Sequence, residues 1–271
     1  MTAESPLGKP AADPGEYSPE SLHSIVRAED RAALGISGIL PFHGCDLWNA
    51  WELTWLSSQG LPQVVTAQIR VPVDSPNIIE SKSLKTYLNS FAMTNCSSID
   101  TVTKTIADDL GACTGSDVDV RLSDPQSAAG IEIEPLPGDC LDSRSLRCDR
   151  WEVDAGLLQA AADDIISEQI HSHLLRSLCP VTSQPDFGSV AISYHGPRID
   201  RDSLLRYIVS YRQHHAYHES CVERMFVDIQ ERCQPDRLTV YARYQRRGGI
   251  DINPFRSNYQ PDPPNGRLWR Q

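Results

Sequence analysis

Hydrophobic positions recur with two different periods along the chain, and these periods predict the same order of elements twice. The first half predicts a strand, two helices and a strand, over 63–73, 81–91, 99–110 and 117–122. The second half predicts that order again, over 188–195, 201–212, 219–233 and 237–246. Each half is therefore expected to form a β-sheet with a pair of helices inserted between its strands.

The two halves also resemble each other in sequence. A shift of 120 residues places "IESKSLKTYLNSF" on "IDRDSLLRYIVSY" without a gap, and the same shift places Cys113 on Cys233. Helix-forming sequences resemble one another by nature, but the shared order of elements makes an internal duplication the preferred interpretation.

The differences between the halves suggest where chemistry is located. The second half has His218 and Glu219 at the start of its second helix, where the first half has Ser98 and Ile99. The second half also has Cys179 ahead of its strand, where the first half has no cysteine. This complementary loss predicts one site shared by the two halves.

Composition limits the possible partners and compartment. The 271 residues are 40% hydrophobic and 23% charged, which is enough to bury a core and suits two domains. The formal net charge of −11 disfavours a nucleic-acid or anionic-membrane surface. The first thirty residues are polar, so we expect a flexible lead-in and no signal peptide, and no apolar run predicts a membrane span. Eight cysteines without a CxxC pair then indicate reduced thiols in the cytoplasm.

"SLCPVTSQPDFGS", residues 177–189, combines a thiol with an acid in a proline-constrained segment. Cys179 could be a nucleophile if its thiolate is stabilised, and Asp186 could move protons to and from an adduct. The alternative is a simple turn between strands with an inert, buried cysteine. A regulatory disulfide between Cys179 and Cys221 is a further hypothesis.

"HHAYHESC", residues 214–221, gathers three histidines, a glutamate and a cysteine. His218 and Glu219 could face a ligand, with the Glu219 carboxylate accepting two hydrogen bonds from a guanine-like base. Two alternatives are zinc ligation by members of the cluster and a solvated turn between helices.

"RYQRRGG", residues 243–249, places Arg246 and Arg247 ahead of two glycines. Glycine allows a ligand to approach the backbone closely and arginine donates to phosphate, while Lys82 and Lys85 could extend the patch. The alternative is an ordinary basic turn. The GxGxxG and GxxxxGK[ST] motifs of other nucleotide sites are absent from the sequence.

Six strings, taken in order and spacing, resemble one family. They are "LPFHGCDLW", "ESKSLKTYLNSF", "SLCPVTSQPDFGS", "YHESCVERM", "YARYQRRGGIDINPFRSN" and "RLWRQ", and they span roughly residues 38–271. The chain resembles the long, two-module form of the NADPH-dependent 7-cyano-7-deazaguanine reductases, nitrile reductases that act in queuosine biosynthesis and so in tRNA modification. Residues 92–150 resemble this family only loosely.

The resemblance implies an α+β fold of tandem tunnelling-fold (T-fold) modules, each an antiparallel sheet with two helices packed on one face. We expect a flexible segment over 1–33, a first module over 34–150 and a second over 151–271. The family further implies a cytoplasmic homodimer that acts on a small deazapurine and binds neither nucleic acid nor membrane directly.

The resemblance also implies roles for individual residues. Cys179 would attack the nitrile carbon to form a covalent thioimide, and Asp186 would donate the proton. The expected substrate contacts are Ile79, Glu80, Ser81, His218 and Glu219, the expected NADPH contacts are Ser81, Lys82, Arg247 and Gly248, and no metal is expected. Two rivals remain: a zinc-dependent cyclohydrolase-like enzyme on the same fold, with Cys179 and the 214–221 cluster as ligands, and a non-catalytic purine-binding protein.

Overall fold

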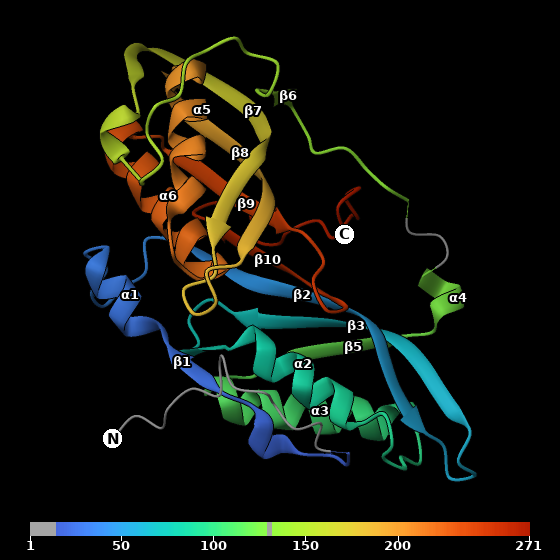
Figure 1. Ribbon diagram of the computed structural model, residues 1–271. Helices are drawn as coiled ribbons and strands as arrows, with labels where there is room; N and C mark the ends of the chain where they lie inside the picture. Colours follow the sequence, from blue (N-terminus) through green and yellow to red (C-terminus); the bar gives the residue numbers. More distant parts are fainter. Residues whose placement is uncertain (1–14, 129–131) are drawn as a thin grey trace. The chain divides into compact units, whose positions relative to one another are not determined.

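The computed structural model describes residues 15–128 and 132–271 and shows a mixed α/β protein (Figure 1). Contacts between Cα atoms divide the chain into two units, each described here by itself. Unit 1 comprises Met1–Glu29, Asp46–Ile131 and Arg246–Asp251, and unit 2 comprises Asp30–Cys45, Glu132–Gln245 and Ile252–Gln271, as far as their residues are described. Among the described residues, no helix has the length and apolar character needed to cross a membrane.

Unit 1 is built on a three-stranded run of sheet with the order β5-β3-β2. Its elements are η1 (Pro19–Ser21), β1 (Ser24–Val26), β2 (His43–Leu56), β3 (Pro62–Pro72), β4 (Asn77–Ile79), α2 (Ser81–Ser90), α3 (Ile99–Thr114), β5 (Asp119–Ser123) and α4 (Pro125–Ala128). β1 pairs antiparallel with β4 in a small second sheet. The apolar side chains Val102, Ile106 and Leu110 recur every four residues along α3 and are fully buried, which fixes the face that this helix packs inward.

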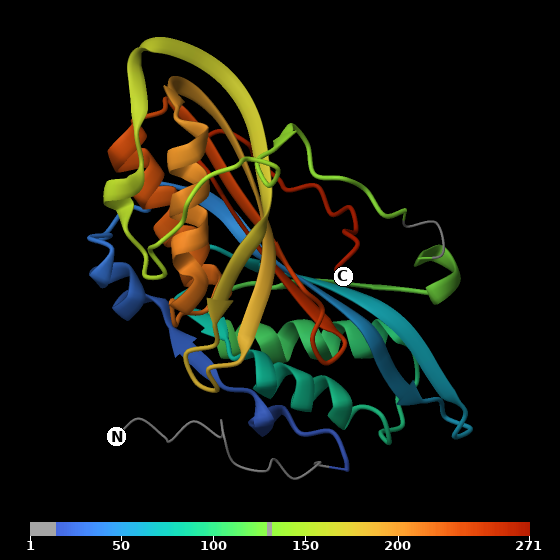
Figure 2. The same cartoon turned by 45° about the horizontal axis from the view of Figure 1, so that its top comes forward.

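Unit 2 has a five-stranded run with the order β10-β9-β8-β7-β6. Its elements are β6 (Asp139–Cys140), η2 (Ala155–Leu157), β7 (Ala160–Leu178), β8 (Pro185–Ile199), α5 (Arg201–Ser210), η3 (Tyr211–Gln213), α6 (His218–Cys233), β9 (Arg237–Tyr244) and β10 (Ile250–Ser257). β7 and β8 form a long antiparallel hairpin, and α5 and α6 cover one face of the strands in both views (Figures 1 and 2). α1 (Arg27–Ala33) and the first residues of β2 contribute to this unit through the segment from 30 to 45.

The paired helices confirm most of the predicted element order and correct the repeat register. α2 and α5 begin and end 120 residues apart, and each is capped by the acid before it, because Glu80 accepts from the backbone of Lys82 and Ser83 while Asp200 accepts from Ser203. α3 and α6 begin and end 119 residues apart instead. The ungapped alignment is therefore off by one residue in the second helix, where Thr114 rather than Cys113 corresponds to Cys233.

The spacing of 119 residues also changes which residues of α3 correspond to which residues of α6. Ile99 and Asp100 correspond to His218 and Glu219 as the first two residues of their helices. The carboxylate position is thus kept in both halves, but Asp100 is exposed whereas Glu219 is buried. The predicted pairing of Ser98 and Ile99 with this dyad is wrong by one position.

The unit boundaries differ from the predicted ones. Of the flexible segment expected over 1–33, residues 1–14 lie outside the described residues. The remainder forms η1, β1 and α1, and Arg27 and Arg31 in it are buried. Unit 1 also takes in Arg246–Asp251 from the far end of the chain, so a single cut near residue 150 does not separate the units.

Candidate functional site

Cys179 lies in a tight turn at the tip of the β7–β8 hairpin. Its backbone N–H donates to the carbonyl of Gln184 at 2.9 Å, and the N–H of Ser183 donates back to the carbonyl of Cys179 at 3.0 Å. Ser183 has a φ of +53°, which tightens the turn at the cost of backbone strain. The thiol is partly exposed. The turn therefore holds this sulfur at a fixed place where a ligand can reach it.

Asp186 lies next to the turn on the helix-covered face of the hairpin. It is directly opposite Ser177 in the β7–β8 ladder, and only 4% of it is exposed. Because residues opposite each other in a ladder share a face, Ser177 and Asp186 point to the same side of the hairpin, and Cys179 follows β7 directly in the turn. The predicted nucleophile and proton carrier therefore lie at the same end of the β7–β8 hairpin.

His218, the first residue of α6, completes this cluster. Its Nε2 lies 3.4 Å from Oδ2 of Asp186, and its ring lies against the ring of Tyr244 with centroids 3.9 Å apart. Glu219 follows in the first turn of α6 and is 3% exposed. The start of α6 is the positive end of its helix dipole, which favours a negatively charged group such as a ligand or the Glu219 carboxylate there.

Backbone pairing explains why α6 begins beside Cys179. The N–H of Leu178 donates to the carbonyl of His214 at 2.8 Å, and the N–H of Ala216 donates to the carbonyl of Leu178 at 3.2 Å. The segment before α6 therefore runs along the last residue of β7. This supports the first interpretation of the "HHAYHESC" segment, in which its end faces a ligand site.

Three buried groups lie beside Asp186: Ser177, Cys221 and Tyr244 are each no more than 1% exposed, and Ser177 and Tyr244 were not predicted as part of the site. Burial raises the pKa of the Cys221 thiol to about 12, with the neighbouring Ser177 and Tyr244 hydroxyls opposing that rise. Burial also raises the pKa of Tyr244 well above its usual value. Both groups are therefore neutral near pH 7 and surround the acid with neutral dipoles. Cys179 and Cys221 are free thiols in this structure, and the disulfide hypothesis stays a prediction.

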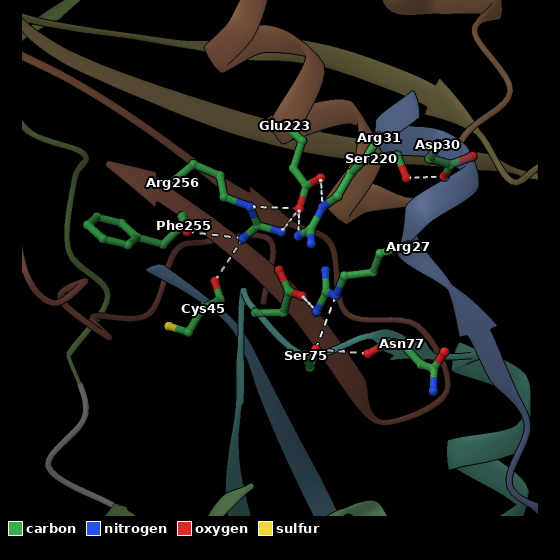
Figure 3. A network of polar contacts seen from close by, with 11 residues as sticks. Arg27, Asp30, Arg31, Cys45, Ser75, Asn77, Ser220, Glu223, Phe255 and Arg256 are labelled. Carbon is green, nitrogen blue, oxygen red and sulfur yellow. Dashed lines mark hydrogen bonds and ion pairs between the residues drawn. The ribbon is translucent and has the colours of Figure 1, made fainter. Parts of the chain in front are cut away.

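α6 is held in place by a buried ion-pair network centred on Glu223, one turn after Glu219 (Figure 3). Arg31 donates from Nε to Oε2 at 2.9 Å and from Nη2 to Oε1 at 2.8 Å. Arg256 donates to Oε1 from Nε at 3.2 Å and from Nη2 at 2.9 Å, and its Nη1 donates to the carbonyl of Cys45 at 3.1 Å. Two guanidinium groups thus fix one carboxylate, and with it the helix that carries His218 and Glu219.

The other predicted substrate contacts lie in unit 1. Ile79 ends β4 and is 2% exposed, and Ser81 opens α2. Glu80, between them, caps α2: its Oε1 accepts from the N–H of Lys82 at 2.8 Å and its Oε2 from that of Ser83 at 2.7 Å. An ionised carboxylate has about four acceptor positions, so capping leaves Glu80 capacity for a ligand as well.

The predicted cofactor contacts also lie in unit 1, where the turn that holds Gly248 lies against Lys85 of α2. Gly248 and Gly249 have φ of +59° and +81°, which makes 247–250 a tight turn closed by Arg247 and Ile250. A Cβ added at Gly248 would lie 3.1 Å from Cδ of Lys85, on the same helix as Ser81 and Lys82. The bare glycine backbone, three cationic side chains and the N-terminus of α2 suit the phosphates of a nucleotide cofactor.

Potential metal ligands come together at a place other than the cluster that the zinc-dependent alternative would use. Over residues 15–128 and 132–271, the ligand atoms that converge within 4.8 Å of one another are those of Cys140, His171 and His173. These residues lie outside the set of Cys179 and residues 214–221 that the zinc-dependent rival requires.

His214, in the turn before α6, is expected to make the protein sensitive to acid. Burial, with the charges of Arg224 and His215 adding to it, lowers the pKa of His214 to about 4. In the unfolded chain the pKa of this histidine is higher, about 6.5. Between about pH 6.5 and 4 the unfolded state therefore binds a proton that the folded state does not bind. The free energy of unfolding should therefore fall as pH drops from about 6.5 to 4, by about 1–2 kcal/mol after allowing for partial exposure.

Urea unfolding at pH 7.5, 5.5 and 4.5 measures this effect. His214→Asn should lose less stability over this range than the wild type, because it removes the titrating group. His43→Asn, at an exposed position on β2, is the control and should follow the wild type. Parallel pH curves for all three proteins would contradict the assignment.

Two protein families and several named relatives match this chain in sequence. Residues 14–122 match the family described as "Nitrile reductase, 7-cyano-7-deazaguanine-reductase N-term", and residues 185–263 match the family described as "QueF-like protein". A relative from Paraburkholderia phytofirmans, named NADPH-dependent 7-cyano-7-deazaguanine reductase, is 52% identical over 274 residues, covering 100% of both chains. A relative of the same name from Burkholderia lata is 52% identical over 269 residues and covers 98% of both.

One solved structure is also similar in part. The crystal structure of the archaeosine synthase QueF-Like in the apo form covers 38% of this chain and 100% of that chain, at 16% identity. Its TM-score of 0.31 is too low to bear on the fold.

Proposed function

Because the chain belongs to the NADPH-dependent 7-cyano-7-deazaguanine reductase family, we propose that Cys179 carries the reduction of a nitrile to a primary amine. The protein is an NADPH-dependent oxidoreductase, and its substrate is 7-cyano-7-deazaguanine, a small molecule used in queuosine biosynthesis. The product is the 7-aminomethyl compound. The observation that supports the proposed mechanism best is the hydrogen-bonded turn that holds the partly exposed Cys179 at the same end of the β7–β8 hairpin as the buried Asp186.

The proposed first step is addition of the thiol across the C≡N bond. The sulfur of Cys179 bonds to the nitrile carbon, the thiol proton leaves sulfur, and a proton is delivered to the nitrile nitrogen. The product is a thioimide, S–C=N–H, which accepts hydride more readily than a nitrile. NADPH supplies the hydride for each of the two reductions when bound. The first hydride and a proton give S–CH–NH2; its C–S bond then breaks, a proton passes from nitrogen to sulfur, and a free thiol and an imine result. The second hydride and a second proton give the amine.

Asp186 is proposed to move the protons. Its position at the same end of the β7–β8 hairpin as Cys179 suits delivery of a proton to the substrate nitrogen, and His218 Nε2 at 3.4 Å can stabilise the carboxylate once that proton has left. The dry setting made by Ser177, Cys221 and Tyr244 also supports this role, because it would keep water from hydrolysing the imine.

Substrate recognition is proposed to depend on Glu219 and His218, with Ile79, Glu80 and Ser81 as further contacts. A buried carboxylate can accept two hydrogen bonds from the amidine edge of the deazaguanine, and leaving such a group unpaired is costly. Ser81, Lys82, Arg247 and Gly248 are proposed to hold NADPH through its phosphates. The finer architecture, tandem T-fold modules assembled into a homodimer, belongs to the same proposal.

Intact-mass spectrometry tests the mechanism directly. The protein incubated with 7-cyano-7-deazaguanine in the absence of NADPH should gain the mass of one substrate molecule per chain. Adding NADPH should remove the adduct and consume two equivalents of NADPH for each amine formed. A protein that turns over but never carries the adduct would exclude a covalent path through Cys179.

Asp186→Asn should separate proton transfer from binding. The amide keeps the shape of the side chain but cannot deliver a proton, so kcat should fall by about 10²–10⁴-fold while KM for the substrate changes little. Steady-state kinetics measure both constants. Asp163→Asn, at an exposed position on β7, is the control and should leave both unchanged. A D186N enzyme with wild-type kcat would assign the proton to another group.

A further inference from the structure

The edge of the unit 2 sheet holds a cluster of donor atoms that the proposed reaction does not use. Cys140 on β6 is directly opposite His171 in the parallel β6–β7 ladder, and His173 lies two residues further along β7. One ligand atom from each of the three side chains lies within 4.8 Å of the other two. The cluster therefore comes from strand register and not from a chance meeting of long, mobile side chains.

The cluster lies on the face of the sheet opposite to Asp186. His171 is opposite Ala191 in the ladder, whereas Ser177 is opposite Asp186. Residues 186 and 191 differ by an odd number, so their side chains point to opposite faces of β8. Any ligand at this cluster is separate from the proposed chemistry at Cys179.

Both imidazole rings are oriented as they are in metal sites. Nδ1 of His171 lies 3.0 Å from the carbonyl of Pro137, which can only accept, so Nδ1 carries the proton and Nε2 has the free lone pair. Nδ1 of His173 lies 2.8 Å from Oγ of Ser189, which can fix its ring in the same way. A hydrogen bond from the second nitrogen to an oxygen is the usual support for a metal-bound histidine.

The donor set selects the metal. One thiolate and two imidazoles suit Zn²⁺, whereas Mg²⁺ and Ca²⁺ require oxygen ligands. Around tetrahedral zinc, S and N ligand atoms are about 3.3–3.6 Å apart, so each pair of ligand atoms would have to approach by at most about 1.5 Å. Cys140 is exposed, so the ion can enter from solvent, and the fourth position would hold water.

We propose that Cys140, His171 and His173 form a zinc site that fastens the β6 segment to the edge of the sheet. β6 is two residues long and pairs with β7 only through Asp139 and Cys140. A zinc ion bound by Cys140 of β6 and by His171 and His173 of β7 would reinforce this short pairing. The site is structural and stands whether or not Cys179 is the nucleophile.

Metal titration of untagged, full-length apoprotein tests the proposal. Zinc sulfate should bind at one equivalent per chain by elemental analysis after desalting. Cobalt(II) chloride should give the near-ultraviolet thiolate-to-metal band and the visible bands of tetrahedral Co²⁺. Cys140→Ser should abolish the thiolate band, and His171→Ala and His173→Ala should each weaken zinc binding at least about 100-fold.

Two controls keep the result specific. Cys148→Ser and Cys179→Ala should both bind zinc as the wild type does, and retention by Cys179→Ala would also count against the zinc-dependent rival. In the wild type, zinc should protect Cys140 from iodoacetamide, a readout that needs no variant to fold. Absence of the cobalt thiolate band, or zinc content unchanged in Cys140→Ser, would overturn the site.

Discussion

Replacing Cys179 by alanine is expected to lower the rate of nitrile reduction by about 10⁴-fold or more, because the covalent path has no other nucleophile to use. The substrate should still bind, since Glu219 and His218, the proposed recognition groups, are unchanged. The substrate-mass adduct seen without NADPH should vanish. The variant should fold normally, because Cys179 lies in a partly exposed turn whose hydrogen bonds are made by the backbone.

Three measurements on one sample decide this prediction: NADPH oxidation, intact mass after incubation with substrate, and substrate affinity by calorimetry. Cys148→Ser is the matched control, because Cys148 is also a partly buried thiol of unit 2. It should keep both the activity and the adduct. An adduct that persists in C179A would move the nucleophile elsewhere, and unchanged activity with unchanged affinity would favour a non-catalytic role for Cys179.

Elements with a clear period were predictable, and elements without one were not. α2, α5 and α6 lie within a few residues of their predictions, because their apolar residues recur at helical spacing and an acidic or polar residue begins each one. β7 was missed although it is the longest strand. Its first half, "AAADDIISEQ", shows no alternation of apolar and polar residues and is largely exposed, and only its antiparallel pairing with β8 makes it a strand.

The site residues that lie in short sequence motifs could be predicted, whereas those that reach the site only through tertiary packing could not. Cys179, Asp186, His218 and Glu219 stood in two compact strings, and the structure gathers them at one end of unit 2. Tyr244 could have been found, because it ends an alternating strand whose other inward residues are apolar, so its hydroxyl is the exception there. Cys140 could not, because no local spacing links it to His171 and His173.

Glu223 shows a further limit of sequence analysis, since its importance comes from two arginines far away in sequence. We expect Glu223→Gln to lower the free energy of unfolding by about 3–5 kcal/mol, because the amide removes the negative charge that pairs with the buried guanidinium groups of Arg31 and Arg256. The midpoint of urea unfolding, followed by tryptophan fluorescence, measures the loss. Glu231→Gln, at an exposed position on the same helix, should change stability by less than about 0.5 kcal/mol.

A second substitution distinguishes charge burial from lost packing. Adding Arg31→Met to Glu223→Gln removes one of the two buried cations that have lost the Glu223 charge and puts an apolar side chain in its place, so part of the stability should return. If E223Q is as stable as E231Q, the ion-pair network contributes little to the stability of the protein. If the double variant is less stable than E223Q alone, Arg31 acts through contacts other than its pair with Glu223. Recovery would establish that α6, with His218 and Glu219 at its start, is held by charge pairing in the core of unit 2.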